Sequence, residues 1–332
     1  HQKHSLIAGI RSLNRTVRGI PRVLPVDSLN KRWDTLRNVQ EKVPAYLECY
    51  PGGEPEYSLQ HPLPRYDLQA LQQAARSVQD QMIARSGCGR FSFVQGHIAT
   101  IAGADAAYQG WSGTGVVIVL TFPDLHPLCH AYANRVTTFP YLPGLFSFRE
   151  LPVIMEAFEK LPCLPDTLLL DGHGYAHPRR FGFACQAGGP RDTSFGVAKR
   201  PLIGKYTLPG HIRGSSSEVI DDGEVIGMAV KTQTGVRPVF VSAGYRTDLD
   251  GAVRITHAAG GQHRIPEPLR MAGILARRSR TIFFQNDLKL HHLLPHMGAS
   301  TGWLPASGSA KPVHFFQRVI AIPFVRDIPV FR

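Results

Sequence analysis

The sequence predicts an α/β protein in which a mixed β-sheet carries helices on its faces. Short apolar runs with brief connections fill residues 98–136, as in an antiparallel meander. A nearly all-apolar run at residues 166–171 is typical of a strand buried on both faces. Segments with apolar residues at helical spacing alternate with later runs of this kind, and this alternation places helices on the faces of the sheet.

The first half of the chain contains one helix and then the meander. Apolar residues recur at helical spacing over residues 66–86, which should form a helix that covers the sheet. Gly, Ser, Pro and Asp in the short connections separate the next three expected strands, at residues 98–108, 115–122 and 128–136. A loop at residues 137–145 leads to a helix that begins near Ser147.

The second half alternates more regularly between strands and helices. The strand at residues 166–171 is followed by a short helix at residues 179–187 and a strand at residues 193–199. The last expected elements are two strands and one helix, at residues 225–232, 238–242 and 248–259. The order of these elements predicts a mixed sheet with helices on both faces.

The 332 residues, 43% of them hydrophobic, are enough for one large globular domain with appendages. We expect a central domain at residues 66–273, a poorly ordered basic extension at residues 1–65 and a basic C-terminal extension at residues 274–332. The formal net charge of +12 divides among these into +2, +4 and +6, respectively. A basic protein attracts nucleic acid without sequence preference, so the charge gives mild support for such a partner.

Two further features of the sequence indicate where in the cell the protein works. The chain has no apolar run of about 18 residues, so no membrane-spanning helix and no membrane partner are expected. The five cysteines are scattered, and their odd number argues against a disulfide framework. We therefore expect a reducing compartment, the cytoplasm.

Three carboxylates stand within or near the ends of predicted elements. Asp105 interrupts a short apolar run, and Glu150 lies near the start of the helix after residue 147. Asp171 ends a strand and is followed by Gly172 and Gly174, which would let another backbone come close. Acids at the ends of adjacent elements can share a cation.

Such oxygen ligands suit Mg²⁺, which keeps some of its waters and binds phosphate oxygens. Two ions would activate a water and stabilise the leaving oxygen of a phosphodiester, with Asp105 best placed to bridge them. Lys199 would orient the water or offset phosphate charge. Two plainer interpretations stay open. Ser147 and Glu150 have capping-box spacing, and Lys199 also fits a solvated lysine at a strand end.

Over residues 66–273 the sequence resembles endonuclease V, the deoxyinosine 3′ endonuclease family. The resemblance implies a ribonuclease H-like mixed sheet flanked by helices. Its Pro-Tyr-Leu-Pro-Gly and Asp-Gly-His-Gly motifs are highly specific in this order. The matching stretches are residues 102–108, 139–150, 165–180, 196–199, 238–246 and 264–268.

The resemblance implies a role for each matching residue. Asp105, Glu150 and Asp171 would bind the metal and act in catalysis, with Lys199 as the active-site lysine. A wedge would enter the duplex at the lesion and stack where a base has left. This wedge would be formed by Pro140, Tyr141, Leu142 and Pro143. The remaining implied substrate-binding residues are Gly144, Gly172, Gly174 and His177, of which the glycines would shape a pocket for a flipped hypoxanthine.

The implied activity is a Mg²⁺-dependent cut on the 3′ side of deoxyinosine or inosine in DNA repair, with Mn²⁺ able to replace Mg²⁺. The expected partner is DNA containing deoxyinosine, with inosine-containing RNA as a second one, and we expect a monomer. Two alternatives stay open: a ribonuclease H-like nuclease acting on inosine-containing RNA, and a non-catalytic nucleic-acid binder. The sequence departs from the family at residues 185–190, which are shorter, and at Gly273, where the family has Asp or His.

Overall fold

The computed structural model describes residues 68–86, 98–110, 112–137, 139–188 and 193–293. The strands are β1 (Thr100–Gln109), β2 (Ser112–Thr121), β3 (Pro127–Val136), β4 (Thr167–Leu170), β5 (Ser194–Ala198), β6 (Lys205–Tyr206), β7 (Ser216–Asp221), β8 (Glu224–Val230) and β9 (Val239–Ala243). The helices are α3 (Leu68–Ser86), α4 (Ser147–Glu159), α5 (Phe183–Ala187), α6 (Leu249–Ala258) and α7 (Glu267–Leu293).

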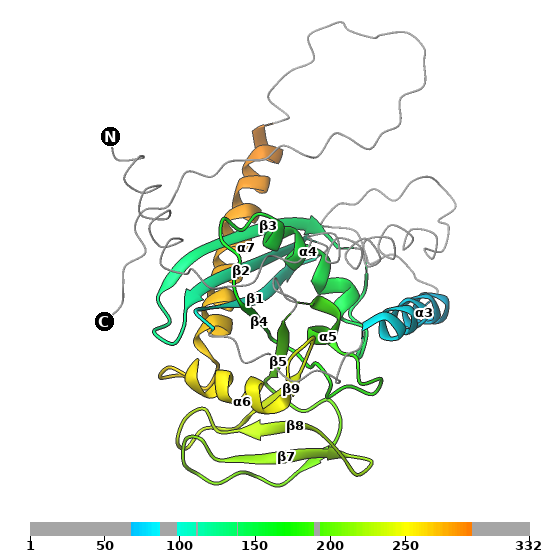
Figure 1. Ribbon diagram of the computed structural model, residues 1–332. Helices are drawn as coiled ribbons and strands as arrows, with labels where there is room; N and C mark the ends of the chain where they lie inside the picture. The colour runs from blue at the N-terminus through cyan, green and yellow to red at the C-terminus, as the bar shows by residue number, and fades with distance from the viewer. Residues whose placement is uncertain (1–67, 87–97, 111, 138, 189–192, 294–332) are drawn as a thin grey trace, which may run out of the picture. The chain divides into compact units, whose positions relative to one another are not determined.

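All of these strands belong to one mixed sheet of order β3-β2-β1-β4-β5-β9-β8-β7-β6 (Figure 1). β1, β4 and β5 run parallel to one another, and the other neighbouring pairs are antiparallel. The first three strands form the predicted antiparallel meander. The α/β prediction of a mixed sheet flanked by helices is therefore confirmed.

Strand residues alternate between two cores, one on each face of the sheet. Ala104 and Leu170 belong to the core formed with α3, α4 and α5. Leu169 and Val197 belong to the other core, formed with α6 and the first turns of α7. The central strands are thus buried on both faces, which explains the nearly continuous apolar run of β4.

Two parts of the fold differ from the sequence-based expectation. β6 and β7 were not predicted, because they lie at one end of the sheet and many of their residues are exposed. α7 was not predicted either, and it runs without a break across residue 273, so the expected domain boundary falls inside a helix. Residues 1–67 and 294–332, which include most of the two expected extensions, lie outside the described residues. Among the residues that are described, no helix has the length and apolar character needed to cross a membrane.

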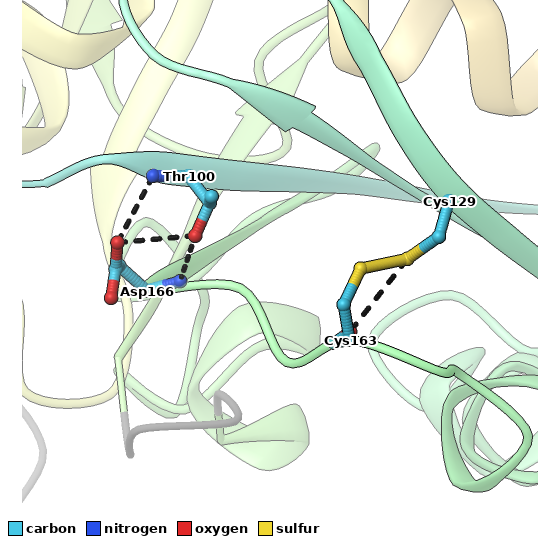
Figure 2. Close-up of a disulfide and its surroundings, with 4 residues drawn as sticks. All are labelled: Thr100, Cys129, Cys163 and Asp166. Carbon is cyan, nitrogen blue, oxygen red and sulfur yellow. Dashed lines mark hydrogen bonds between the residues drawn. A yellow bond between two sulfur atoms is a disulfide. The ribbon is translucent and has the colours of Figure 1, made fainter. Parts of the chain in front are cut away.

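A disulfide joins Cys129 of β3 to Cys163 in the connection between α4 and β4 (Figure 2). The expectation that the cysteines form no disulfide was wrong, since two of them meet although they lie 34 residues apart. The same connection is held to β1 by Asp166, whose carboxylate accepts hydrogen bonds from Thr100 N and Oγ1 at 3.0 and 3.1 Å. The segment that leads into β4 is therefore fixed on both sides.

Candidate functional site

Asp105 and Asp171 are brought together by two adjacent parallel strands. β1 and β4 pair with Ala104 opposite Leu170, Asp105 is the next residue of β1, and Asp171 directly follows the last residue of β4. Neighbouring strand residues point to opposite faces, so Asp105 lies on the face that carries α6 and α7, where its Oδ2 lies 2.7 Å from a Cβ built at Gly273. Lys199, just after β5, forms an ion pair with Asp171 through Nζ and Oδ2. Three of the predicted site residues therefore meet at one end of the central strands.

Glu150 reaches the aspartates from the opposite face, in the first turn of α4. Burial raises the pKa of Glu150 to about 8, and repulsion from Asp105 and Asp171 adds to the rise. The capping interpretation of this acid is wrong, because Phe146 is the N-cap residue and has no side-chain cap. Ser147 Oγ instead donates to Gln186 Oε1 at 2.8 Å.

The charge of this cluster is unbalanced toward the acids. Burial and then the neighbouring Asp171 raise the pKa of Asp105 to about 6, while Lys199 and Arg277 oppose the rise. A cation held by these oxygens would remove the repulsion, and carboxylate oxygens are the donors that hard divalent ions prefer. Within the described residues, however, no three His, Cys, Asp or Glu side chains lie close enough to hold a metal ion as they stand.

The donor chemistry therefore fits a divalent ion, while the side-chain arrangement does not yet surround one. Lys199 contacts Oδ2 of Asp171, and the second oxygen of that carboxylate takes no part in this ion pair. Two other acids do not complete the set. Asp248 caps α6 by accepting a hydrogen bond from Gly251 N at 2.5 Å, and Asp250 lies in the first turn of the same helix. Both follow β9, whose last residues pair with the start of β5 and not with its end near Lys199.

The loop after β3 presents an exposed aromatic side chain on a fixed base. Tyr141 is 67% exposed. Phe139 at the base is buried, and its carbonyl accepts from Arg149 Nη1 at 2.6 Å. The Arg149 guanidinium also lies over the Tyr108 ring, 4.3 Å from its centre. Pro140 and Leu142 are half-buried and Pro143 is exposed, so the predicted wedge has Tyr141 and Pro143 at its tip.

A hydrogen bond joins this loop to the segment after Asp171. His177 Nε2 lies 3.0 Å from the carbonyl oxygen of Gly144. A Cβ atom at Gly172 would lie 2.9 and 3.0 Å from the rings of Phe183 and Phe146, so only glycine fits between these rings. A Cβ at Gly174 would lie 2.0 Å from the carbonyl oxygen of Ala243 in β9.

Packing thus explains Gly172 and Gly174 without a bound base, and their assignment to a hypoxanthine pocket stays a prediction. Gly144 differs from them, because it has a positive φ of 77° and its Cβ direction points to His177.

Several residues that shape the site were missed in the sequence. Arg264 Nη2 donates to the carbonyls of Lys199 and Pro238, at 2.6 and 2.8 Å, and so holds the end of β5. The rings of Phe146 and Phe183 pack in a tilted arrangement beside Gly172, with their centres 4.7 Å apart. Phe146 and Arg264 lie in stretches that carry the family resemblance, which is the signal that could have found them.

Comparison with known proteins agrees with this arrangement. The Endonuclease V family model matches residues 89–274. Endonuclease V of Roseiflexus castenholzii is 41% identical over 224 residues, which cover 67% of this chain and 97% of that protein.

Solved structures are similar as well. The crystal structure of Endonuclease V from Streptomyces avermitilis has a TM-score of 0.60 and 37% identity, covering 64% of this chain and 94% of that one. The fold is also shared by Ciona intestinalis Endonuclease V in complex with a 23mer DNA containing an inosine followed by a ribo-adenosine. That structure has a TM-score of 0.56 and 24% identity, covering 66% of this chain and 100% of that one.

The family match spans more than half of the chain, and the Roseiflexus relative is matched over nearly its whole length. The matched region contains the paired strands with Asp105 and Asp171, the helix with Glu150, and Lys199. This chain belongs to the Endonuclease V family and is a nuclease that hydrolyses phosphodiester bonds.

Proposed function

We propose that this chain is a Mg²⁺-dependent endonuclease that recognises deoxyinosine, or inosine, and cuts the strand on its 3′ side in DNA repair. One observation carries the proposal. Asp105 and Asp171 directly follow the last paired residues of two adjacent parallel strands, with Lys199 paired to Asp171 and Glu150 within electrostatic range of both. A nuclease that works with oxygen-bound metal needs such a set of acids beside a cationic side chain.

Asp105, Glu150 and Asp171 are the residues that would hold Mg²⁺, or Mn²⁺ in its place. When bound, the ion supplies an activated water and stabilises the charge on the phosphate. Lys199 has its amine beside the same carboxylates and is 53% exposed, so it can turn from Asp171 to a phosphate oxygen or to the attacking water. The raised pKa of Glu150 makes this acid the one whose ionisation depends most on a neighbouring cation.

Recognition of the lesion is assigned to the loop at residues 139–146. Among the described residues, Tyr141 is the exposed large aromatic side chain nearest the acids along the chain, and base stacking on such a ring is worth about 1–3 kcal/mol. Prolines on both sides restrict the loop and lower the entropy lost on binding. Hypoxanthine lacks the exocyclic amine of guanine, so a close-fitting site beside Gly144 would exclude guanine by its size.

A second candidate, cleavage of inosine-containing RNA, has one observation in its favour. The Ciona relative is seen with DNA whose inosine is followed by a ribo-adenosine. A ribonucleotide beyond the lesion places a 2′-hydroxyl at the position where a 3′-side cut falls. Sugar recognition there would distinguish RNA from DNA.

The test uses the full chain with four labelled strands, namely inosine and guanine versions of one DNA and of the same sequence in RNA. We expect a single Mg²⁺-dependent product beyond inosine and none from the guanine strands, with EDTA abolishing the cut. Equal cleavage of inosine and guanine strands would refute the specificity, and the DNA-to-RNA rate ratio decides between the two candidates.

Substitutions tie that activity to the proposed site. Asp105→Asn and Asp171→Asn should each abolish cleavage and leave binding of the inosine strand within a few-fold of wild type. Asp124→Asn is the matched control, since Asp124 is exposed in the turn between β2 and β3. Cleavage near the wild-type rate in either site variant contradicts the assignment. The monomeric state and the cytoplasmic location stay predictions.

A further inference from the structure

Helix α7 lies against β1 at two places where glycine removes a side chain. A Cβ at Gly103 would lie 2.2 Å from the backbone carbonyl of Pro268, so β1 and the start of α7 touch backbone to backbone. A Cβ at Gly273 would lie 2.7 Å from Oδ2 of Asp105. Position 273 therefore faces the carboxylate cluster, and glycine leaves space beside Asp105.

The guanidinium of Arg277 lies beside this space. Arg277 follows Gly273 by one helical turn, on the same side of α7. Its Nη1 and Nη2 atoms lie 3.4 and 3.8 Å from the Cβ position of Gly273, next to the Asp105 carboxylate. Among the influences on the pKa of Asp105, burial is the largest and raises it, whereas Arg277 lowers it. The arginine thus lies within electrostatic range of the acid.

Two cationic side chains lie near the pair of aspartates. Lys199 pairs with Asp171 from the end of β5, and Arg277 on α7 lies within electrostatic range of Asp105. Arg277 is exposed, so solvent and ligands can approach it. A guanidinium has five N–H donors in a planar fork that matches phosphate as well as carboxylate. Arg277 can therefore offer donors to an anion that approaches the carboxylates.

We propose that Arg277 binds a non-bridging phosphate oxygen of the strand to be cut. When nucleic acid binds, the guanidinium turns to this phosphate from α7, while Lys199 acts from the end of β5. The inference rests on the proposed function of the carboxylates. It adds a substrate-binding residue that lies outside the stretches carrying the family resemblance.

The test compares full-length Arg277→Gln with Arg278→Gln, its exposed neighbour on α7, so that both variants lose one charge. Binding of inosine-containing and undamaged duplex is measured in EDTA over a range of salt. We expect Arg277→Gln to reduce the slope of log affinity against log salt by about one, as for one lost phosphate contact. With Mg²⁺, its single-turnover cleavage should fall about 10²–10³-fold, and Arg277→Lys should recover part of both properties. Equal slopes and equal rates for the two Gln variants overturn the proposal.

Binding to undamaged duplex measures the phosphate contact without any recognition of inosine. Absence of an inosine-specific cut would therefore reject the proposed function without deciding the role of Arg277.

Discussion

The imidazole of His177 donates from Nε2 to the carbonyl oxygen of Gly144 at 3.0 Å. Its other nitrogen, Nδ1, accepts from the backbone N–H of Arg179 at 3.2 Å. Both contacts are satisfied only by the neutral ring, and burial lowers the pKa of His177 accordingly. The histidine therefore fixes the loop that carries Tyr141 relative to the segment that follows Asp171.

Replacing His177 should loosen this link. His177→Phe keeps most of the volume but removes both hydrogen bonds, each worth about 0.5–1.5 kcal/mol. We expect the ratio of affinities for inosine and undamaged duplex to fall about 5–10-fold, with a smaller effect on binding of undamaged duplex. His126→Phe, in an exposed turn, is the control. An unchanged ratio in His177→Phe would show that the link does not support recognition.

Tyr141 offers a test of the wedge. Because its side chain is 67% exposed, Tyr141→Ala should leave the melting temperature nearly unchanged. Loss of stacking, about 1–3 kcal/mol, should lower inosine affinity about 5–150-fold. Tyr141→Phe retains the ring and should retain the preference, as measured by competition binding. If Tyr141→Ala still prefers inosine as strongly as wild type does, another residue is the wedge.

The stability of the metal-free protein should depend on the ionisation of Glu150. Its pKa rises from 4.5 to about 8 in the folded state, mainly through burial. The folded state then keeps a proton that the unfolded chain releases, so stability falls as pH rises through this window. Burial lowers the pKa of His173 and His177, so these residues reduce the stability as pH falls. This effect on stability is confined below about pH 6.5, the usual pKa of histidine.

Melting temperatures measured in EDTA between about pH 6.5 and pH 8.5 therefore report the ionisation of Glu150. We expect the midpoint to fall by on the order of 5 °C, and Mg²⁺ to reverse the fall more at the higher pH. Glu150→Gln should abolish the pH dependence, whereas Glu218→Gln, on the exposed β7, should keep it. The same slope in wild type and Glu150→Gln would mean that another group titrates.

Truncation tests where the folded domain ends. Beyond residue 273, α7 contributes the buried Ala276 and a hydrogen bond from Arg280 Nη1 to the carbonyl oxygen of Tyr108 at 3.1 Å. A fragment of residues 66–293 should fold and cut, whereas residues 66–273 should melt at a clearly lower temperature. Equal melting temperatures and rates for the two fragments would place the domain end at 273, as the sequence suggested.

The disulfide predicts a response to reductant. Cys129 and Cys163 close a loop of 34 residues, for which the chain-entropy estimate is about 3–4 kcal/mol. Dithiothreitol should therefore lower the melting temperature of the wild type by several degrees. The double variant Cys129→Ser/Cys163→Ser should melt near the reduced wild type and not respond to dithiothreitol. A wild type that does not respond lacks the bond in solution.

Part of the carboxylate cluster could be predicted because two acids stand out against apolar elements. Asp105 breaks the run of β1, and Asp171 follows the four buried residues of β4, so short-range pattern was enough to single them out. The contacts around these acids depend on long-range docking. Arg277 comes within electrostatic range of Asp105 because the start of α7 lies against Gly103 of β1, and no local pattern encodes that approach.

The same distinction explains the missed elements. β7 carries serines and alternates little in burial, so its sequence resembles a loop. α7 opens with Glu267 and Pro268, and two prolines at positions 266 and 268 conceal the start of a helix within a stretch that matches the family. The disulfide pairs cysteines from two different elements, which sequence spacing does not indicate.

The parallel pairing of β1 with β4 also has a consequence for the order of folding. The meander β1-β2-β3 is made of neighbouring hairpins and can form while synthesis continues. Asp105 gains Asp171 only after α4 and the whole crossover have been made, because parallel strands need such a connection. A nascent or half-folded chain thus contains the first acid without the second. On the proposed assignment of these acids, such a chain cannot yet assemble the pair that the cut requires.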